Sequence, residues 1–341
     1  MANKPNDHKI PQTMMEAVRY FQDPGVCVEF MAMIRWPNGP ECPHCQSKRH
    51  SFLRTRRIWK CLDCRKQFSA KVGTIFEDSA IPLDKWMTAV WLIVNNKNGV
   101  SSWELHRGLK VTQKAAWFML QRIRLALQDD SPNKFGGPDT EVEVDETYVG
   151  AKAKNMHKSR KIRITKARSE IRNAEATIAS RYLAKTPVQG ILDRAQRKVR
   201  ATVVPNVKRE TLQQRILNEV ESGTRVYTDQ AVSYEMALAN DFVHEMVNHL
   251  EGYVNGRVHT NGIENFWSLL KRSLNGTYVA VEPFHLHRYL DEQMFRYNNR
   301  ATKDNPLSDS DRFLLAMHQV AGKRLTYAEL TGKADGSPAP F

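Results

Sequence analysis

Two pairs of cysteines constrain the fold of this chain more than any other feature. Four of its five cysteines form C-x-x-C motifs, Cys42 with Cys45 and Cys61 with Cys64, and fifteen residues separate the pairs. Each motif turns two thiolates toward one point, and two such turns complete a tetrahedron around Zn²⁺. Four protein ligands leave no open position, so the spacing predicts a structural zinc site. The remaining cysteine, Cys27, follows Asp23-Pro24, a helix-start pair, and is expected to be a buried thiol.

The charge of the chain indicates the kind of partner. Its 51 Lys and Arg against 37 Asp and Glu give a net charge of +14, which favours a polyanion such as nucleic acid or an anionic membrane. The longest apolar run, Ala89–Val94, is far short of the ~20 residues that a membrane span needs. The first twelve residues have no hydrophobic stretch, so we expect no secretory signal and a reducing compartment.

The segment around the second cysteine pair is strongly basic. Residues Lys48 to Lys66 include eight Lys or Arg and one Asp, with Trp59 and Phe68 expected to pack beneath the cysteine turns. This composition favours contact with nucleic acid. A solvated knuckle or a protein-docking module would have the same composition.

Three helices are predicted after the zinc segment. One spans Pro82–Val94, a second begins at Ser101 with a Glu104 capping box, and a third runs from its cap Thr112 to Leu127. Short helices joined by tight turns are typical of a helix-turn-helix, whose last helix enters the major groove. The side chains expected to be exposed there are Gln113, Lys114, Gln121 and Arg124. Many three-helix bundles bind no DNA, so a purely structural role for these helices stays open.

A turn-rich stretch, 129–139, marks a domain boundary. Beyond it, the alternation of apolar and acidic residues in Glu141–Val149 predicts a strand with acids on one face, and Asp145 is one of these acids. A later strand ends in Asp229. The mixture of strands and helices predicts a layered α/β domain. The further elements expected are strands at Val188–Asp193, Lys198–Val204, Arg225–Thr228 and Val243–Val247, and a helix at Arg209–Val220.

The segment His259–Arg272 is predicted to be an amphipathic helix. Glu264, Ser268 and Lys271 fall on one polar face, opposite Ile263, Phe266, Trp267 and Leu270. Three acids, in mid-strand (Asp145), at a strand end (Asp229) and on a helix (Glu264), are what a two-metal phosphoryl-transfer site requires. Acids at such positions are also commonly solvated, and the residues alone leave both interpretations open.

The chain resembles the DDE transposases of bacterial insertion sequences that carry an N-terminal zinc ribbon and an RNase H-like core of the retroviral integrase superfamily. The resemblance covers about residues 20–300. Its most specific motifs are Tyr227-Thr-Asp-Gln230, His259–Arg272, and His287–Glu292 with Phe295–Asn298. Glu264 follows Asp229 by 35 positions, and Lys271 follows Glu264 by seven, as in that superfamily.

The resemblance implies that Asp145, Asp229 and Glu264 are catalytic acids that bind two Mg²⁺ or Mn²⁺ ions, and that Lys271 contacts DNA together with Arg272. One departure is that the third acid has amide neighbours, Asn261 and Asn265. We prefer Glu264, because a full negative charge binds Mg²⁺ better than a neutral carbonyl. The roles of Glu143 and His259 stay open.

The expected fold is α/β, with an RNase H-like mixed-sheet core preceded by a four-cysteine zinc ribbon and a helix-turn-helix-like module. The expected segments are a helical 1–38, a ribbon 39–72, a helical domain 73–130, a catalytic domain 140–300 with a basic insertion 151–172, and a helical extension 301–341. That insertion holds nine Lys or Arg between Lys152 and Arg172 and is expected to be a DNA-contacting loop or a solvated one.

The expected function is that of a transposase that binds terminal inverted repeats and catalyses metal-dependent hydrolysis and strand transfer. Its expected partners are transposon and target double-stranded DNA and, for synapsis, further copies of the chain as a dimer or larger oligomer. We expect it in the bacterial cytoplasm, at the nucleoid, with no membrane partner. The alternatives are a nuclease of the same fold without strand transfer and a non-catalytic zinc-ribbon DNA-binding protein.

Overall fold

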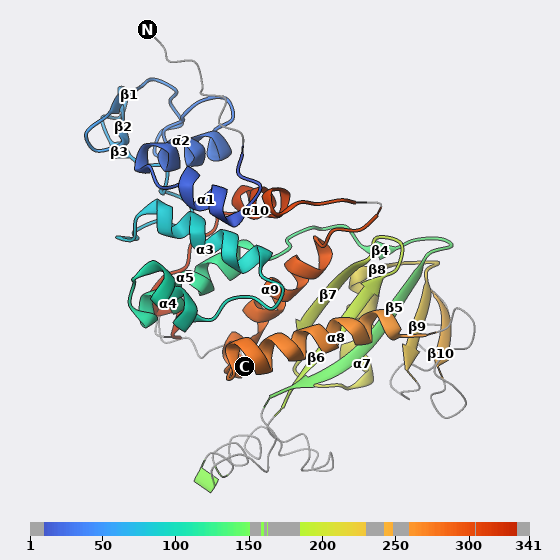
Figure 1. The fold of residues 1–341 in the computed structure, drawn as a ribbon. Coiled ribbons are helices and arrows are strands. Elements are labelled where there is room, and N and C mark those ends of the chain that lie inside the picture. The colour runs from blue at the N-terminus through green and yellow to red at the C-terminus, as the bar shows by residue number, and fades with distance from the viewer. Residues whose placement is uncertain are drawn as a thin grey trace. The chain divides into compact units, whose positions relative to one another are not determined.

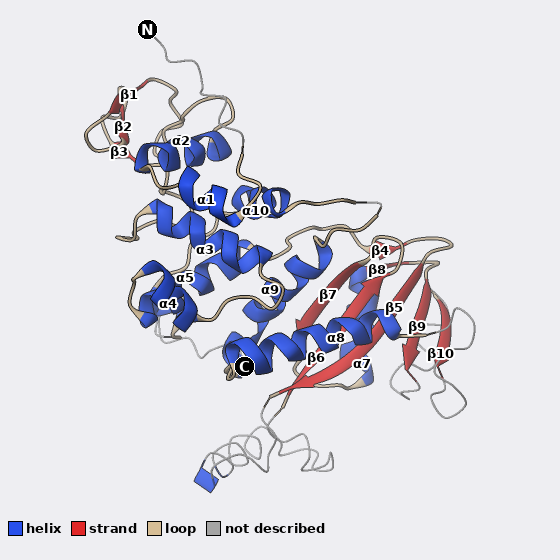
Figure 2. Ribbon diagram, in the orientation of Figure 1, coloured by secondary structure: helices blue, strands red, loops and turns tan. Residues whose placement is uncertain are grey.

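The computed structural model describes residues 10–150, 158–159, 162, 185–229, 242–247, 259–303 and 305–332. The side chains of Asp229, Met246 and Val247 lie outside the description, as does almost all of the basic insertion 151–172. Contacts divide the chain into two units, one of residues 1–129 and 299–339, the other of 130–298 and 340–341. Figure 1 shows the elements along the chain, and Figure 2 distinguishes helices from strands. No helix among the described residues is long and apolar enough to span a membrane.

The first unit begins with helices and the zinc ribbon. Asp23 caps α2 by accepting from the backbone N–H of Gly25, and Pro24 opens that helix. The ribbon is a three-stranded antiparallel sheet in the order β1-β2-β3. Trp59 and Phe68 are buried, as expected, with their rings stacked 6.0 Å apart. The elements are α1 (Met14–Tyr20), α2 (Pro24–Arg35), β1 (His50–Leu53), β2 (Ile58–Cys61) and β3 (Gln67–Phe68).

Three helices follow the ribbon, and the predicted caps are confirmed. Ser101 and Glu104 form a capping box at the start of α4, and the Thr112 hydroxyl accepts from Ala115 at the start of α5. Between them, Lys110 adopts a left-handed conformation that ends α4 and turns the chain. The elements are α3 (Leu83–Asn95), α4 (Ser102–Leu109) and α5 (Gln113–Ala126).

The end of the chain completes the first unit. Phe313, on α10, is fully buried among Phe21, Phe30 and Trp91, with ring centroids 5.2 to 5.8 Å away. These contacts come from segments nearly 300 residues apart, so periodicity alone could not reveal them. The elements are α10 (Asp309–His318) and α11 (Tyr327–Leu330).

The second unit is built on a mixed five-stranded sheet in the order β10-β9-β5-β6-β7. The strand β5 is antiparallel to β6 and parallel to β9, and this mixture is the topology of an RNase H-like core. The strands are β5 (Glu141–Val149), β6 (Thr186–Asp193), β7 (Lys198–Val203), β9 (Arg225–Asp229) and β10 (Val243–Val247), and a short pair joins β4 (Phe135–Gly136) to β8 (Val220–Glu221).

Helices cover both faces of this sheet, as Figure 1 shows. Val142 and Val144 of β5 pack toward α7 with Leu212 and Ile216. On the opposite face, Val188, Leu192 and Val199 pack with α8 and α9. The alternation of β5 therefore directs its valines to one layer and Glu143 and Asp145 to the other. The helices are α7 (Arg209–Glu219), α8 (Asn261–Ser273), η4 (Leu274–Tyr278), η5 (Pro283–His285) and α9 (Leu286–Asn298).

Candidate functional site

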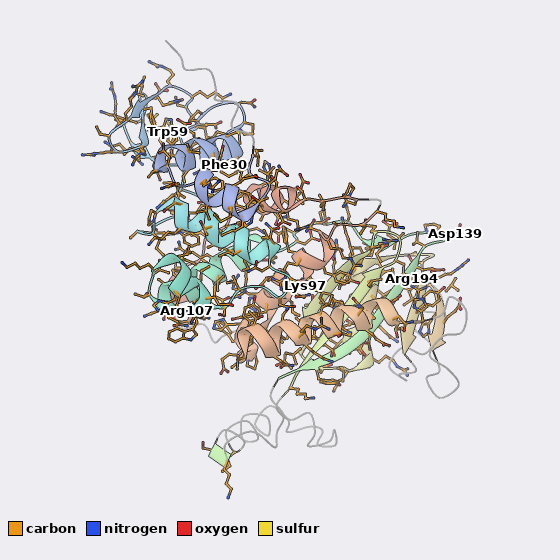
Figure 3. All side chains as sticks on the ribbon, viewed as in Figure 1. Phe30, Trp59, Lys97, Arg107, Asp139 and Arg194 are labelled. Carbon is orange, nitrogen blue, oxygen red and sulfur yellow. The ribbon has the colours of Figure 1, made fainter. Side chains whose placement is uncertain are left out.

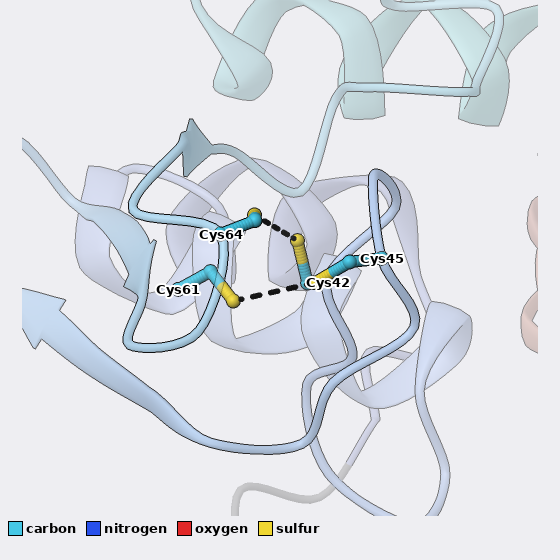
Figure 4. Close-up of side chains that lie close together, drawn as sticks. All are labelled: Cys42, Cys45, Cys61 and Cys64. Atoms are coloured by element: carbon cyan, nitrogen blue, oxygen red, sulfur yellow. Dashed lines mark hydrogen bonds between the residues drawn. The ribbon is translucent and has the colours of Figure 1, made fainter.

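The four ribbon cysteines form a cluster suited to a zinc ion. Their sulfur atoms all lie within 4.8 Å of one another, with Cys42 to Cys64 at 3.6 Å and Cys45 to Cys61 at 3.5 Å (Figure 4). Sulfurs at the corners of a tetrahedron with Zn–S bonds of about 2.3 Å would be about 3.8 Å apart. The donor set and its spacing fit a structural zinc ion, as the sequence predicted.

The surface of the ribbon is basic. Seven of the eight Lys and Arg between residues 48 and 66 are exposed, and Lys60 is half-buried. Arg49 pairs with Asp63, at 2.8 Å. His44 is exposed, as expected for a turn residue. The exposed surface around the cysteine turns is therefore rich in positive charge.

The predicted helix after residue 259 is confirmed as α8, with the predicted faces. Glu264, Ser268 and Lys271 are exposed together with Arg272. Ile263, Phe266, Trp267 and Leu270 are buried in the core between the sheet and α9. The Thr260 hydroxyl donates to Oε1 of Glu264 at 2.9 Å, which holds this carboxylate in the first turn of the helix.

Asp145 lies on the face of β5 that α8 covers. Its Oδ2 accepts a hydrogen bond from Nε1 of Trp267 at 2.9 Å, and its Oδ1 accepts one from the backbone N–H of Glu146 at 2.8 Å. Trp267 follows Glu264 by three residues, about one helical turn. The indole therefore links the helix of Glu264 directly to the carboxylate of Asp145.

A missing side chain on β6 makes room for that indole. Gly190 is the register partner of Asp145, and a Cβ built on it would lie 2.6 Å from the Trp267 ring. Only glycine permits so close an approach of a ring to the strand. The sequence indicated Trp267 only as a core residue, because helical spacing predicts burial but not the direction of the indole N–H.

The backbone register brings Asp229 close to Asp145. The parallel strands β5 and β9 pair from Glu141 with Arg225 to Val144 with Thr228, so the next residues in line are Asp145 and Asp229. Neighbouring strands are about 4.8 Å apart. The two predicted acids thus occupy adjacent backbone positions on central strands of the sheet.

Arg194, which the sequence did not single out, lies at the end of β6 (Figure 3). Its guanidinium donates to Glu143 Oε1 at 2.7 Å, to Glu141 Oε2 at 2.9 Å and to the carbonyl oxygen of His259 at 2.6 Å. Glu143 is 1% exposed. Glu143, whose role the sequence left open, forms a salt bridge with Arg194. No local motif marks Arg194, since these partners come from two segments that are distant along the chain.

The predicted DNA-facing surface of α5 needs a correction. Gln121 and Arg124 are 0% and 1% exposed, so the expectation that they project into solvent is wrong. Lys114 is exposed, and its ammonium lies 4.5 Å from the ring centroid of Tyr327. Gln113 is half-buried and donates to Ser102. The α5 pattern has one apolar face, but tertiary packing covers more of the helix than that face.

Comparisons with known proteins identify the family. Residues 136–298 match the model described as the ISXO2-like transposase domain, and residues 23–67 match the transposase zinc-ribbon domain. A transposase-like protein of Haemophilus influenzae is 36% identical over 106 residues, 31% of this chain and 85% of that protein. The chain belongs to the ISXO2-like transposase family.

Two further comparisons show lower sequence identity over longer parts of the chain. A protein in the transposable element ISH50 of Halobacterium salinarum is 29% identical over 266 residues, 76% of this chain and 86% of that protein. Among solved structures, a simian T-cell lymphotropic virus intasome in complex with a PP2A regulatory subunit has a TM-score of 0.26 and 11% identity, covering 59% of this chain and 66% of the matched one.

Proposed function

We propose that this chain catalyses DNA transposition with Asp145, Asp229 and Glu264 as its catalytic acids. The observation that carries the proposal is the tie between α8 and β5. The hydrogen bond from Trp267 to Asp145 brings the helix of Glu264 onto the strand of Asp145, and the register of β9 brings Asp229 beside it. Glu264 is exposed in the first turn of the same helix, and its carboxylate would complete the proposed ion site.

The three acids would hold two divalent ions, Mg²⁺ or Mn²⁺, because hard cations prefer carboxylate oxygens. When bound, such ions supply charge neutralisation and Lewis acidity for attack at a phosphodiester. The hydrogen bonds to both oxygens of Asp145 fix the orientation of its carboxylate. In the proposed reaction, water cleaves a phosphodiester at each transposon end, and the freed 3′-hydroxyl attacks target DNA in the same site.

The proposed DNA contacts come from both units. On α8, Lys271 and Arg272 are exposed two turns beyond Glu264, within reach of the DNA strand that enters the site. In the first unit, the basic ribbon and the exposed Lys114 would bind the terminal inverted repeats. We do not include Arg124, because its side chain is buried. Joining two ends requires at least two active sites, so we propose a dimer or larger oligomer on DNA, working at the nucleoid.

The test is a reaction of the full chain with labelled terminal DNA, a target plasmid and Mg²⁺. Asp145→Asn, Asp229→Asn and Glu264→Gln are each expected to abolish cleavage and joining while leaving DNA binding in place. A Ser268→Ala variant, on the same exposed face of α8 as Glu264, is the matched control and should react normally. Activity that survives in the three acid variants contradicts the assignment. Cleavage without joined product would identify a nuclease instead.

A further inference from the structure

Glu143 is a buried acid that the proposed chemistry does not use. Its Oε1 accepts from Nε of Arg194 at 2.7 Å, and its Oε2 accepts from the backbone N–H of Ile263 at 2.9 Å. Ile263 is in the first turn of α8, next to Glu264. With 1% exposure and partners on both oxygens, Glu143 is built to join β5 to α8.

Arg194 extends this tie to the segment that leads into α8. Its Nη2 donates to the carbonyl oxygen of His259 at 2.6 Å and lies 2.8 Å from Nδ1 of the same residue. Its guanidinium also stacks 4.5 Å from the ring centroid of Tyr227 on β9. One planar cation thus contacts β5, β9 and the residues just before α8, a geometry that suits arginine and not lysine.

Gly262 shows how closely the helix approaches Glu143. A Cβ built at this position would lie 2.8 Å from Oε2 of Glu143 and 3.1 Å from a methyl carbon of Leu192. The carboxylate cannot easily move away, because Arg194 and Ile263 both hold it. Any side chain at residue 262 would therefore push the first turn of α8 off the strand.

We infer that Glu143 and Arg194 are positioning residues that fix the first turn of α8 to β5 and thereby set the distance between Glu264 and Asp145. The helical bond from the Glu264 N–H to the Thr260 carbonyl, at 3.1 Å, belongs to this turn. Displacing the turn moves Glu264 with it. The effect of these contacts on catalysis rests on the proposed function, whereas the contacts of Glu143 and Arg194 themselves do not.

The first test compares two glycine variants of the full-length chain. Gly262→Ala forces a side chain against Glu143, whereas Gly276→Ala, just beyond the same helix, adds a Cβ with nothing within 4 Å. We expect faster hydrogen exchange in residues 259–267 of Gly262→Ala, and a half-maximal Mg²⁺ concentration for cleavage about tenfold higher than in the wild type. The Gly276→Ala variant should match the wild type in both measurements.

The second test compares two acids that pair with Arg194 from the same strand. Glu143→Gln keeps the size of the side chain but loses its charge. Glu141→Gln removes the charge of an acid that also pairs with Arg194 but does not make the bond to Ile263 that Glu143 makes. We expect faster exchange at 259–267 in Glu143→Gln and wild-type exchange there in Glu141→Gln. Wild-type exchange and Mg²⁺ dependence in both Gly262→Ala and Glu143→Gln would overturn the inference.

These measurements also separate the inference from the proposed function. If Asp145→Asn still cleaves DNA, the proposed function fails, but hydrogen exchange in the ion-free chain still reports the tie. If Asp145→Asn is inactive and exchange at 259–267 is unaffected by Gly262→Ala, the positioning role fails and the proposed function stands.

Discussion

The hydrogen bond between Trp267 and Asp145 can be removed by exchanging one aromatic residue for another. Trp267→Phe keeps an aromatic ring in the core but deletes the indole N–H that donates to Oδ2 at 2.9 Å. Asp145 is half-buried and keeps the bond from the Glu146 backbone. The variant therefore tests whether orientation of this carboxylate matters separately from its charge.

The size of the effect follows from the environment of the bond. Hydrogen bonds to charged groups contribute about 1.5–3 kcal/mol, and the half-buried site favours the low end because water can replace the indole. If about 1.4 kcal/mol holds the productive orientation, its loss lowers the fraction of competent sites, and the cleavage rate, about tenfold. DNA affinity should be unchanged, since Trp267 is only 4% exposed and cannot reach a phosphate.

The assay is single-turnover cleavage of terminal DNA at saturating protein, with thermal unfolding measured on the same samples. Trp86→Phe is the matched control, because Nε1 of Trp86 donates to the Ser79 hydroxyl at 3.1 Å in the first unit. Trp267→Phe should lose about 1.5 kcal/mol of stability and Trp86→Phe, whose bond goes to a neutral hydroxyl, about 0.5–1.5 kcal/mol, but only Trp267→Phe should slow cleavage. A cleavage rate within about twofold of wild type at every Mg²⁺ concentration would refute the positioning of Asp145 by Trp267, since about tenfold is expected.

Three further predictions follow from the contacts and burial described above. A zinc chelator should make the four ribbon cysteines reactive toward a maleimide, whereas Cys27 should be labelled only after unfolding. Burial, together with the nearby charges of Asp84 and Asp23, raises the pKa of the Cys27 thiol to about 12. Mass spectrometry of the labelled native and denatured chain checks both outcomes. Lys271→Ala should weaken binding of terminal DNA and reduce the log–log salt slope by about 0.9, as fluorescence anisotropy would measure, and an unchanged slope would remove Lys271 from the contact. Arg124→Met should instead leave the salt slope as in the wild type and change only thermal stability, since the arginine is 1% exposed; a reduced slope would restore it as a DNA contact.

Local patterns predicted most elements of the fold. Strand β5 matches its predicted limits, and β10 does as well, because each is a run with strong alternation or a high content of β-branched residues. The caps at Ser101, Thr112 and Asp23 were visible because the signal lies within four residues of each helix start. The cysteine cluster was likewise predictable from spacing alone.

Long-range packing was the part that the sequence did not reveal. The burial of Arg124 depends on tertiary contacts that helical periodicity does not encode. Arg194 contacts β5, β9 and His259, just before α8, which are distant from one another along the chain. The three acids were predicted because the spacing from Asp229 to Glu264 matched a known family, whereas the contact of Trp267 with Gly190 became visible only in the three-dimensional register. The sequence thus predicted the candidate site residues, but it did not predict the residues that contact them from distant parts of the chain.

The burial of Phe313 has a consequence for synthesis on the ribosome. Phe21, Phe30 and Trp91 cannot close their cluster until Phe313 has left the exit tunnel, nearly 300 residues after the first of them. All strands and helices of the second unit emerge before that point. The nascent chain can thus complete the second unit first, and the first unit, although most of it is synthesised earlier, matures last.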